Sequence, residues 1–375
     1  MTDAQKALRD NARDIGMREI EPAAADIDRQ QRFPLEPIKR LAREGMLGIT
    51  VPKALGGAGG DHLTCALVIE ELAGACASTA LVVSMHNFLV CEPILRFGTE
   101  AQKRHWLPTL ATGSNLGCFA FSEASGSSTA EGMTTQARRE GDGWVVDGAK
   151  AFVTAGPAAQ CALVFATTWA DGRIGLSAFL VPTDVPGVSF GPAYNKLGLR
   201  GALAASMTLD KVKLTHAALL GVEGRGEEIL QFATEGNRIG AAALAVGIAR
   251  AAFARATRYA LSRKTDGRSI AEHQTIQFML AEMSTQIDAA RLLAWRAANC
   301  RDVGGAMGAQ ASMAKLLASE VASRVCSDAV QVLGGNGCLA DFSVERHFRD
   351  AKVAEIYEGT TEIQRLGIAS ILLKD

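Results

Sequence analysis

The chain has 375 residues, 48% of them hydrophobic, and its 39 basic residues almost balance its 40 acidic ones. A chain of this length and apolar content can bury a large core in two or three structural units, which excludes a small binding module. The net charge of -1 provides no basic field that would attract nucleic acid.

The N-terminus and the cysteines favour a cytoplasmic protein. Residues 1–16 mix both charge signs and lack the apolar segment of a secretory signal. The apolar stretch 241–248 is far shorter than the ~20 residues that span a membrane, so we expect no membrane span. The 8 cysteines contain no CxxC pair, as expected of reduced thiols, and the 6 histidines have no metal-ligand spacing. We therefore expect no metal.

Residues 1–114 are predicted to form a helical domain. Apolar residues recur at spacings of three to five along residues 4–27, and Pro34 and Pro37 then mark the start of another helix at 38–44. The same periodicity predicts helices at 63–75, 79–97 and 100–111. The glycine-rich loop 51–61 lacks the spacing of a phosphate-binding loop, so we interpret it as a turn.

Residues 115–222 are predicted to form a β domain. Short segments rich in Val, Phe, Thr and Leu have the length of strands, and Asp-Gly pairs between them are turn signals. The expected strands include residues 144–146, 162–165, 176–181 and 206–209.

Residues 223–375 return to a helical period. Long helices are predicted at 227–262, 273–301 and 308–333, with a short one near 361–372. In the third, an apolar stripe is expected to face the core: Met313, Leu316, Leu317, Val321, Val325, Ala329 and Val332. The predicted fold class is therefore α+β and multidomain, with an N-terminal helical domain, a middle β domain and a C-terminal helical bundle.

Three polar clusters interrupt these elements. Residues 119–129 form a small, hydroxyl-rich loop that could approach a flat ligand closely. Residues 333–337, Leu-Gly-Gly-Asn-Gly, follow the last long helix, and a C-terminal cap explains only one of the three glycines. Residues 355–362 place Glu358 beside a glycine just before a helix, where a lone glutamate is ordinarily a solvated side chain.

Taken together with several longer motifs, these clusters resemble the acyl-CoA dehydrogenase family along essentially the whole chain, with a pattern closest to its short-chain members. The resemblance implies N-terminal helices, a middle β domain and a C-terminal four-helix bundle, in agreement with the organisation predicted above. The motifs are KRLAREGMLGITVP (39–52), FGTEAQK (97–103), KLGLRG (196–201), IAEHQTIQF (270–278), QVLGGNG (331–337) and IYEGTTEIQRL (356–366).

The resemblance implies an FAD-dependent α,β-dehydrogenation of a short- or medium-chain acyl-CoA to the trans-2-enoyl thioester. Glu358 would remove the α-proton while flavin N5 takes the β-hydride. Some family members instead carry the base just before an arginine on the preceding long helix. Here that residue is Asn237, before Arg238, and it has no carboxylate.

The resemblance also assigns ligand contacts and partners. The site is expected to be shared between chains of a homotetramer, a dimer of dimers, that passes electrons to an electron-transfer flavoprotein in fatty acid β-oxidation. Substrate contacts are expected at Ser128, Thr168, Glu235 and Arg238. FAD contacts are expected at Phe119, Phe121, Ser122, Ser128, Phe152, Val153, Thr154, Arg263, Thr265, His273, Gln274, Gln331, Gly334, Gly335, Thr360 and Glu362.

The sequence departs from the family pattern at two places. The family's loop Ser/Thr-Glu-Pro-Gly-x-Gly-Ser-Asp here reads SEASGSST at 122–129. The family's Arg-x-x-Phe-Gly here reads RKTDG at 263–267, which puts Asp266 near the expected FAD diphosphate. This would be unfavourable unless Asp266 points away or pairs with Arg268 or Lys264.

These departures leave three alternatives open. One is the same reaction on an acyl group held by an acyl-carrier protein in a biosynthetic pathway. Another is a flavin monooxygenase, against which the retention of Glu358 argues. The third is a non-catalytic homologue that has lost its flavin.

Overall fold

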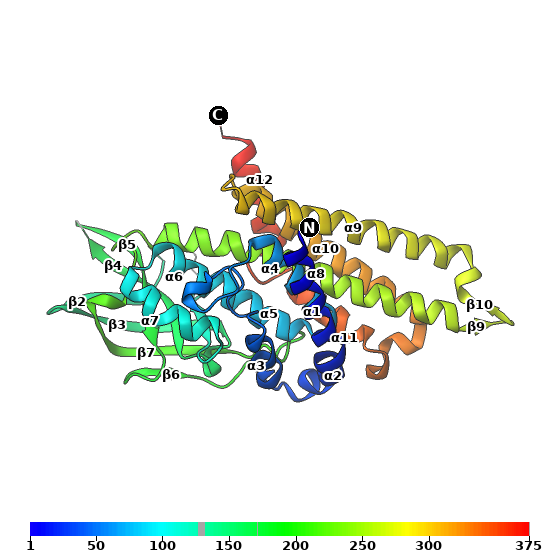
Figure 1. Ribbon diagram of the computed structural model, residues 1–375, viewed down its shortest axis with the longest axis horizontal. Helices are drawn as coiled ribbons and strands as arrows, with labels where there is room; N and C mark the ends of the chain where they lie inside the picture. Colours follow the sequence, from blue (N-terminus) through cyan, green and yellow to red (C-terminus); the bar gives the residue numbers. More distant parts are fainter. Residues whose placement is uncertain (127–131, 171, 375) are drawn as a thin grey trace.

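The computed structural model describes residues 1–126, 132–170 and 172–374. In sequence order, one helical domain precedes the middle sheet domain and a second helical domain follows it, which confirms the predicted fold class. Along the longest axis of the molecule, the sheet domain lies at one end and the long helices of the C-terminal bundle extend to the other, with the N-terminal helices between them (Figure 1).

The N-terminal domain consists of helices that begin at strong capping residues. Thr2 and Thr99 each form a capping box with a glutamine three residues later, and Asp61 caps the helix that follows it. The helices are α1 (Asp3–Ile15), α2 (Glu21–Gln30), α3 (Leu35–Arg43), α4 (His62–Ala75), α5 (Ala77–Met85), α6 (Glu92–Phe97) and α7 (Glu100–Ala111), with π-helical turns at Gly16–Ile20 and His86–Cys91.

The middle domain is an 8-stranded sheet with the order β6-β7-β3-β2-β4-β5-β8, in which β1 pairs with β4 in parallel. Strand β3 extends well beyond the predicted residues 144–146 because bulges let it continue past Gly148 and Lys150. The strands are β1 (Gly117–Ala120), β2 (Gln136–Glu140), β3 (Gly143–Thr154), β4 (Cys161–Ala170), β5 (Arg173–Pro182), β6 (Val188–Phe190), β7 (Ala204–Thr215) and β8 (Leu219–Leu220).

The C-terminal domain is a bundle in which α10 packs against α8, α9 and α11. The fourth bundle helix, α11, lies outside the helices predicted from periodicity. A short hairpin joins α8 to α9, and α12 packs on α10 and projects from the body of the molecule (Figure 1). The elements are α8 (Gly226–Ser262), β9 (Lys264–Thr265), β10 (Arg268–Ser269), α9 (Gln274–Asp302), α10 (Gly308–Leu333), α11 (Val344–Ala354) and α12 (Thr361–Leu372).

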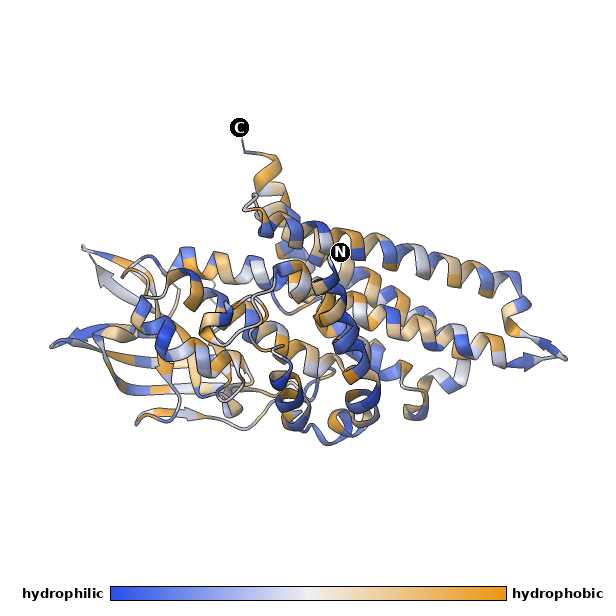
Figure 2. Ribbon diagram, in the orientation of Figure 1, coloured by the Kyte–Doolittle hydropathy of each residue, from blue (hydrophilic) through white to orange (hydrophobic). Residues whose placement is uncertain are grey.

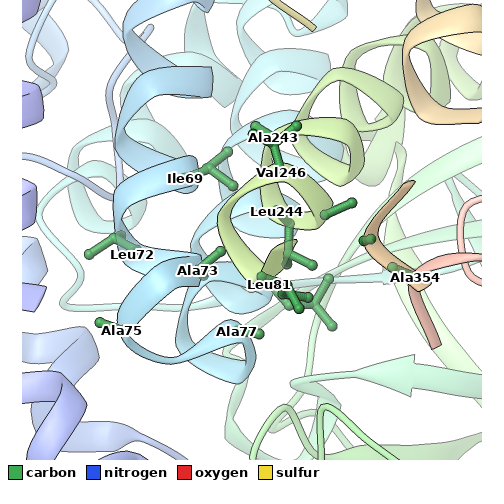
Figure 3. Close-up of a cluster of buried hydrophobic side chains, with 14 of the residues drawn as sticks. Ile69, Leu72, Ala73, Ala75, Ala77, Leu81, Ala243, Leu244, Val246 and Ala354 are labelled. Carbon is green, nitrogen blue, oxygen red and sulfur yellow. The ribbon is translucent and has the colours of Figure 1, made fainter. Parts of the chain in front are cut away.

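Small residues form the core face of the bundle. The stripe predicted for α10 is partly wrong, because Met313 and Leu316 are only half-buried and lie outside the core cluster, whereas the half-buried Leu317 packs against it. The buried face instead includes the alanines at 311, 314, 318 and 322, and their short side chains let α8 and α10 approach closely. Larger aliphatic residues fill the contact of α8 with α4 and α5, among them Ile69, Leu81 and Leu244 (Figure 3).

Two helical stretches, Ala77–Phe97 and Gly226–Ser262, are long and apolar enough to cross a membrane. Within the fold, 89% and 78% of their most apolar windows are buried against other parts of the protein. The hydropathy of both stretches is accounted for by their packing in the core.

Candidate active site

Glu358 lies in the turn between α11 and α12 with a backbone angle φ of 57°, and Gly359 follows with a φ of 87°. A non-glycine residue at positive φ is uncommon and persists only where the surroundings hold it. Glu358 is partly exposed as a residue, but its carboxyl group is enclosed by other groups of the protein. Thr360 caps α12 directly after this turn, and Glu362 lies in the first turn of that helix.

Two buried side chains hold the backbone of this turn. Lys315 on α10 is 0% exposed, and its Nζ donates to the carbonyls of Glu355 at 2.9 Å and Gly359 at 2.8 Å. Gln364 on α12 is also 0% exposed, and its Nε2 donates to the carbonyls of Glu358 at 2.9 Å and Gly359 at 3.1 Å. The sequence analysis missed both residues, although Lys315 is a charge within an otherwise apolar helix face.

Burial is the main electrostatic influence on Glu358, and it raises the pKa of the carboxyl group. Asn237, Arg238 and Lys315 oppose this effect, yet the net pKa remains raised. Burial in turn lowers the pKa of Lys315 to about 8, against the attraction of Glu358 and Glu355. A carboxylate with a raised pKa, surrounded by cationic groups, is suited to act as a base near neutral pH.

A cavity of about 560 Å³ lies between the N-terminal part of α8, the start of α10 and the last turns of α12. Its lining includes Glu235 and Arg238, two of the predicted substrate residues, together with Ser312. Arg238 donates to the Ser312 hydroxyl at 3.4 Å and attracts Glu358, so the cavity adjoins the candidate base. Its size is typical of a site for a small ligand.

The other two predicted substrate residues are not seen in this cavity. Thr168 is buried in the sheet, where its hydroxyl is 2.7 Å from that of Ser177. Ser128 lies outside the described residues.

The predicted flavin contacts of the middle domain lie close together at the junction of β1 and β3. Phe119 and Phe121 both pack against Phe165, with ring centroids 5.2 Å and 5.7 Å apart. The amide of Ala151 donates to the carbonyl of Ser122 at 2.8 Å and joins this segment to β3. These contacts bring the two predicted flavin-contacting segments side by side.

Phe152 is 67% exposed and has a φ of 57°, next to Tyr194 at a centroid distance of 5.2 Å. A flat aromatic ring held outward by a positive φ fits a planar ring ligand such as flavin. Val153 is 0% exposed, so its side chain belongs to the core and only its backbone is available to a ligand. Thr154, at the end of β3, is half-buried.

A buried ion pair anchors the start of the loop that departs from the family pattern. Lys150 Nζ lies 2.8 Å from the Glu123 carboxylate and donates to the carbonyl of Phe121 at 3.2 Å. The same carboxylate accepts from the backbone of Thr134 and Thr135 at 2.7 Å and 2.9 Å. Burial opposes the ionised form of Glu123, but these hydrogen bonds lower its pKa to about 2. Both ends of the loop are therefore fixed despite its missing proline and glycines.

A further group of predicted FAD contacts lies around the β9–β10 hairpin, at the end of the molecule away from the sheet domain (Figure 1). Arg263, Thr265, His273 and Gln274 are exposed around the hydrophilic β9–β10 hairpin (Figure 2). Tyr259 at the end of α8 accepts from Asn336 at 2.9 Å, which brings the end of α10, with Gln331, and the following Gly334 and Gly335 to the same end.

Gly334 and Gly335 form an open stretch of backbone. A Cβ added at either glycine would meet no atom within 4 Å, and Gly334 has a φ of 58°. The amide of Gly334 already donates to the carbonyl of Gln331, but the two exposed glycines let a phosphate-bearing ligand approach the backbone closely. Within one chain, the β9–β10 hairpin lies at the end of the molecule away from the sheet domain, whose strand β3 carries Phe152 (Figure 1). A single chain does not bring the two groups of predicted FAD contacts together.

Asp266 occupies the tip of the β9–β10 hairpin, where Asp266 and Gly267 have φ values of 52° and 81°. Two consecutive positive angles are the pattern of a type I′ turn, which favours Asp-Gly. This turn gives a local reason for aspartate in place of the family's phenylalanine. In the part of the chain that the structure describes, Asp266 forms no ion pair with Arg268 or Lys264.

Comparisons with known proteins cover the whole chain. The acyl-CoA dehydrogenase N-terminal, middle and C-terminal domain families match residues 2–114, 118–212 and 224–373. The short-chain specific acyl-CoA dehydrogenase of Bos taurus mitochondria is 41% identical over 377 residues, which cover 100% of this chain and 91% of the relative.

Solved structures agree with this result. Butyryl-CoA dehydrogenase from Megasphaera elsdenii superimposes with a TM-score of 0.97 at 37% identity and covers 100% of this chain and 99% of its own. A chain from a structure described as the electron transferring flavoprotein of Acidaminococcus fermentans has a TM-score of 0.97 at 36% identity, with the same coverage. The chain therefore belongs to the acyl-CoA dehydrogenase family of FAD-dependent oxidoreductases.

Proposed function

We propose that this protein removes two hydrogens from the Cα–Cβ bond of a short- or medium-chain acyl-CoA, with Glu358 as the base. The observation that carries the proposal is the Glu358 turn, whose backbone is held by hydrogen bonds from Lys315 and Gln364, near a cavity of about 560 Å³. The similarity to a short-chain specific acyl-CoA dehydrogenase and to butyryl-CoA dehydrogenase supports a short acyl group.

The chemistry requires a base of suitable strength at a fixed place. A thioester α-proton is only weakly acidic, so the carboxylate must be held against it, and a raised pKa favours the transfer. Burial raises the pKa of Glu358, while Arg238 and Lys315 keep the ionised form accessible before the reaction. Bound FAD supplies the acceptor of the β-hydride at flavin N5.

The residues at both ends of the chain fit FAD if two chains share each site. Phe152 would cover the flavin ring, and Arg263 with Gly334 and Gly335 of a neighbouring chain would hold the diphosphate. We therefore include in the proposal a homotetramer built of two dimers. A cytoplasmic place in β-oxidation and an electron-transfer flavoprotein as acceptor complete it, the latter supported by the Acidaminococcus neighbour.

Anaerobic bleaching of the flavin tests the substrate class. A panel of straight-chain acyl-CoAs is added to the purified protein, next to the same acyl groups on an acyl-carrier protein. Bleaching by butyryl-CoA or hexanoyl-CoA is expected. Bleaching by carrier-protein thioesters alone would indicate a biosynthetic substrate, and protein without flavin absorbance that binds no added FAD would indicate a non-catalytic homologue.

Glu358→Gln tests the base. The variant should keep FAD and its melting temperature, while the rate of flavin reduction falls about 10²–10⁴-fold, the usual effect of losing one acid-base group. Glu355→Gln is the matched control, because this carboxylate lies in the same turn but pairs with Lys352 at 2.5 Å. Normal flavin reduction by Glu358→Gln would refute the assignment.

A further inference from the structure

Asn237 is a completely buried residue of α8 with one unused hydrogen-bond donor. Its Oδ1 accepts from the Ser84 hydroxyl of α5, at 2.8 Å. Its amide nitrogen Nδ2 has no hydrogen-bond partner among the described residues. Buried polar groups are nearly always paired, so an unpaired amide in the interior calls for a role.

The neighbour that this amide affects is Glu358. Burial raises the pKa of Glu358, and hydrogen bonding by Asn237 is the largest of the effects that oppose it. The carboxylate is therefore close to Asn237, while Nδ2 lacks a partner at normal bonding distance among the described residues. The geometry agrees, because Arg238, next to Asn237, donates to Ser312 at 3.4 Å, and Ser312 lies three residues before Lys315, which holds the Glu358 turn.

We propose that Asn237 is a positioning residue for the base: its amide N–H directs the Glu358 carboxylate, and Ser84 fixes which way the amide faces. This inference rests on the proposed role of Glu358. Asn237 would then have a function at the position where some family members carry the carboxylate base.

The orientation of the amide follows from the donors and acceptors around it. An ionised carboxylate offers only acceptors, so Nδ2 is the end of the amide that can bind it. The Ser84 hydroxyl donates to Oδ1 and holds this orientation. A Cβ at Gly240 would lie 2.0 Å from Ser84 Oγ, so glycine at this position leaves the space that Ser84 needs to reach α8.

Charged and titratable groups also surround Glu358. Arg238 on α8 and Lys315 on α10 attract the carboxylate, and Lys315 is already bonded to two backbone carbonyls. Tyr357 is the preceding residue, and burial together with Glu358 raises the pKa of its hydroxyl. These groups set the charge around the base, whereas Asn237 contributes a neutral, directed donor.

The substitution Asn237→Leu removes the amide donor from a side chain of similar size without adding a charge beside Glu358. The pH profile of anaerobic flavin reduction by butyryl-CoA should show its acid limb raised by about one pH unit or more. The rate on that limb should fall about tenfold, because one pH unit is a tenfold change in the ionised fraction. KM should change less than kcat.

If Asn237 only ties α5 to α8, Asn237→Leu will lower the rate equally at every pH and leave the acid limb at its wild-type position. That result would overturn the inference.

A second measurement does not depend on activity. Melting temperatures are followed against pH for wild type, Asn237→Leu, Glu358→Gln and the double variant. A raised carboxyl pKa makes ionisation cost stability as pH rises, and loss of the amide donor increases that cost. The destabilisation by Asn237→Leu should therefore grow with pH in the wild-type background and become pH-independent in the Glu358→Gln background, where no carboxylate can ionise.

The outcomes separate this inference from the proposed function. Normal flavin reduction by Glu358→Gln would remove both. An inactive Glu358→Gln together with an unchanged acid limb for Asn237→Leu, or the same pH dependence in both melting backgrounds, would remove the inference alone.

Discussion

Lys315 is a charged side chain that the fold buries completely at the back of the Glu358 turn. Its two hydrogen bonds end on carbonyls of the turn, so it acts on the base both through the backbone and through its charge. Buried ammonium groups are unfavourable unless paired, which makes the match between Lys315 and this turn a specific feature of the site.

We expect Lys315→Met to loosen the turn. Methionine fills a similar volume but leaves the carbonyls of Glu355 and Gly359 without their donor. Leaving buried acceptors unpaired should lower the free energy of unfolding by ~2 kcal/mol. Flavin reduction should slow as well, because Glu358 is less well placed. Thermal unfolding and stopped-flow reduction measure the two effects.

Lys6→Met is the control for this substitution, since Lys6 is exposed and pairs only with Asp3 at 3.3 Å among the described residues. A Lys315→Met protein with wild-type melting temperature and reduction rate would show that the two hydrogen bonds of Lys315 do not hold the turn in place.

Sequence reasoning proposes Glu358 as the base but does not reveal the residues that hold its turn. The motif around Glu358 resembles a known family, whereas Lys315 and Gln364 act through backbone carbonyls from two other helices. Helical periodicity assigns a lysine to the surface, so a lysine that faces inward is invisible to it. Positive φ at Glu358 is likewise a property of the folded turn.

At the scale of the elements, a polar network joins the start of α4 to α6 and the end of α9. His62 lies 2.5 Å from Asp302 and 3.1 Å from Glu92, and Arg301 donates to Glu92 at 2.7 Å. The backbone amides of His62 and Leu63 also donate to Asp302. The network ties the N-terminal domain to the C-terminal bundle.

This network should make stability depend on pH. Burial opposes the charged form of His62, but the hydrogen bonds to Asp302 and Glu92 raise its pKa to about 9. A raised histidine pKa stabilises the fold fully below about pH 6.5, and the contribution disappears as pH rises through about 9. The shift corresponds to about 3 kcal/mol.

His62→Gln should therefore cost most near pH 6 and little above pH 9, as measured by chemical unfolding across that range. His105→Gln, at an exposed position on α7, is the control. A destabilisation by His62→Gln that stays constant over this range would contradict the ion-pair account.

The spacing of apolar residues predicts the long helices but does not predict a helix that buries polar residues. Helix α11 buries Arg346, His347 and Asp350, which an apolar pattern assigns to solvent, and it was not predicted. In α10 the core face consists largely of alanines, whereas the predicted stripe included the larger Met313 and Leu316, which are only half-buried. The close approach of α8 determines which face is buried.

At the scale of the whole molecule, the predicted FAD contacts fall into separate groups, and the β9–β10 hairpin of one group lies at the end away from the sheet domain of another (Figure 1). The sequence indicates the residues through family resemblance, but their separation becomes visible only in the fold. Under the proposed arrangement, completing either site takes a second chain, which no pattern within one chain can place.

We expect Arg263→Ala to weaken both FAD binding and assembly. Under the proposed arrangement FAD binds only the assembled protein, so it stabilises the assembly by mass action. The variant should release FAD more readily, and its FAD-depleted form should dissociate or melt earlier. Sedimentation and flavin absorbance measure these effects. Arg104→Ala, an exposed site on α7, is the control, and a stable monomer with full FAD occupancy would refute the shared site.

The separation of Arg263 at the hairpin from Phe152 in the sheet domain has a genetic consequence. Under the proposed arrangement, each site of a dimer combines the ring-facing end of one chain with the hairpin end of the other. In a mixed dimer of an Arg263→Ala chain and a Glu358→Gln chain, one site collects both defects and the other receives neither. Two inactive alleles of this gene would therefore complement each other when their products assemble together.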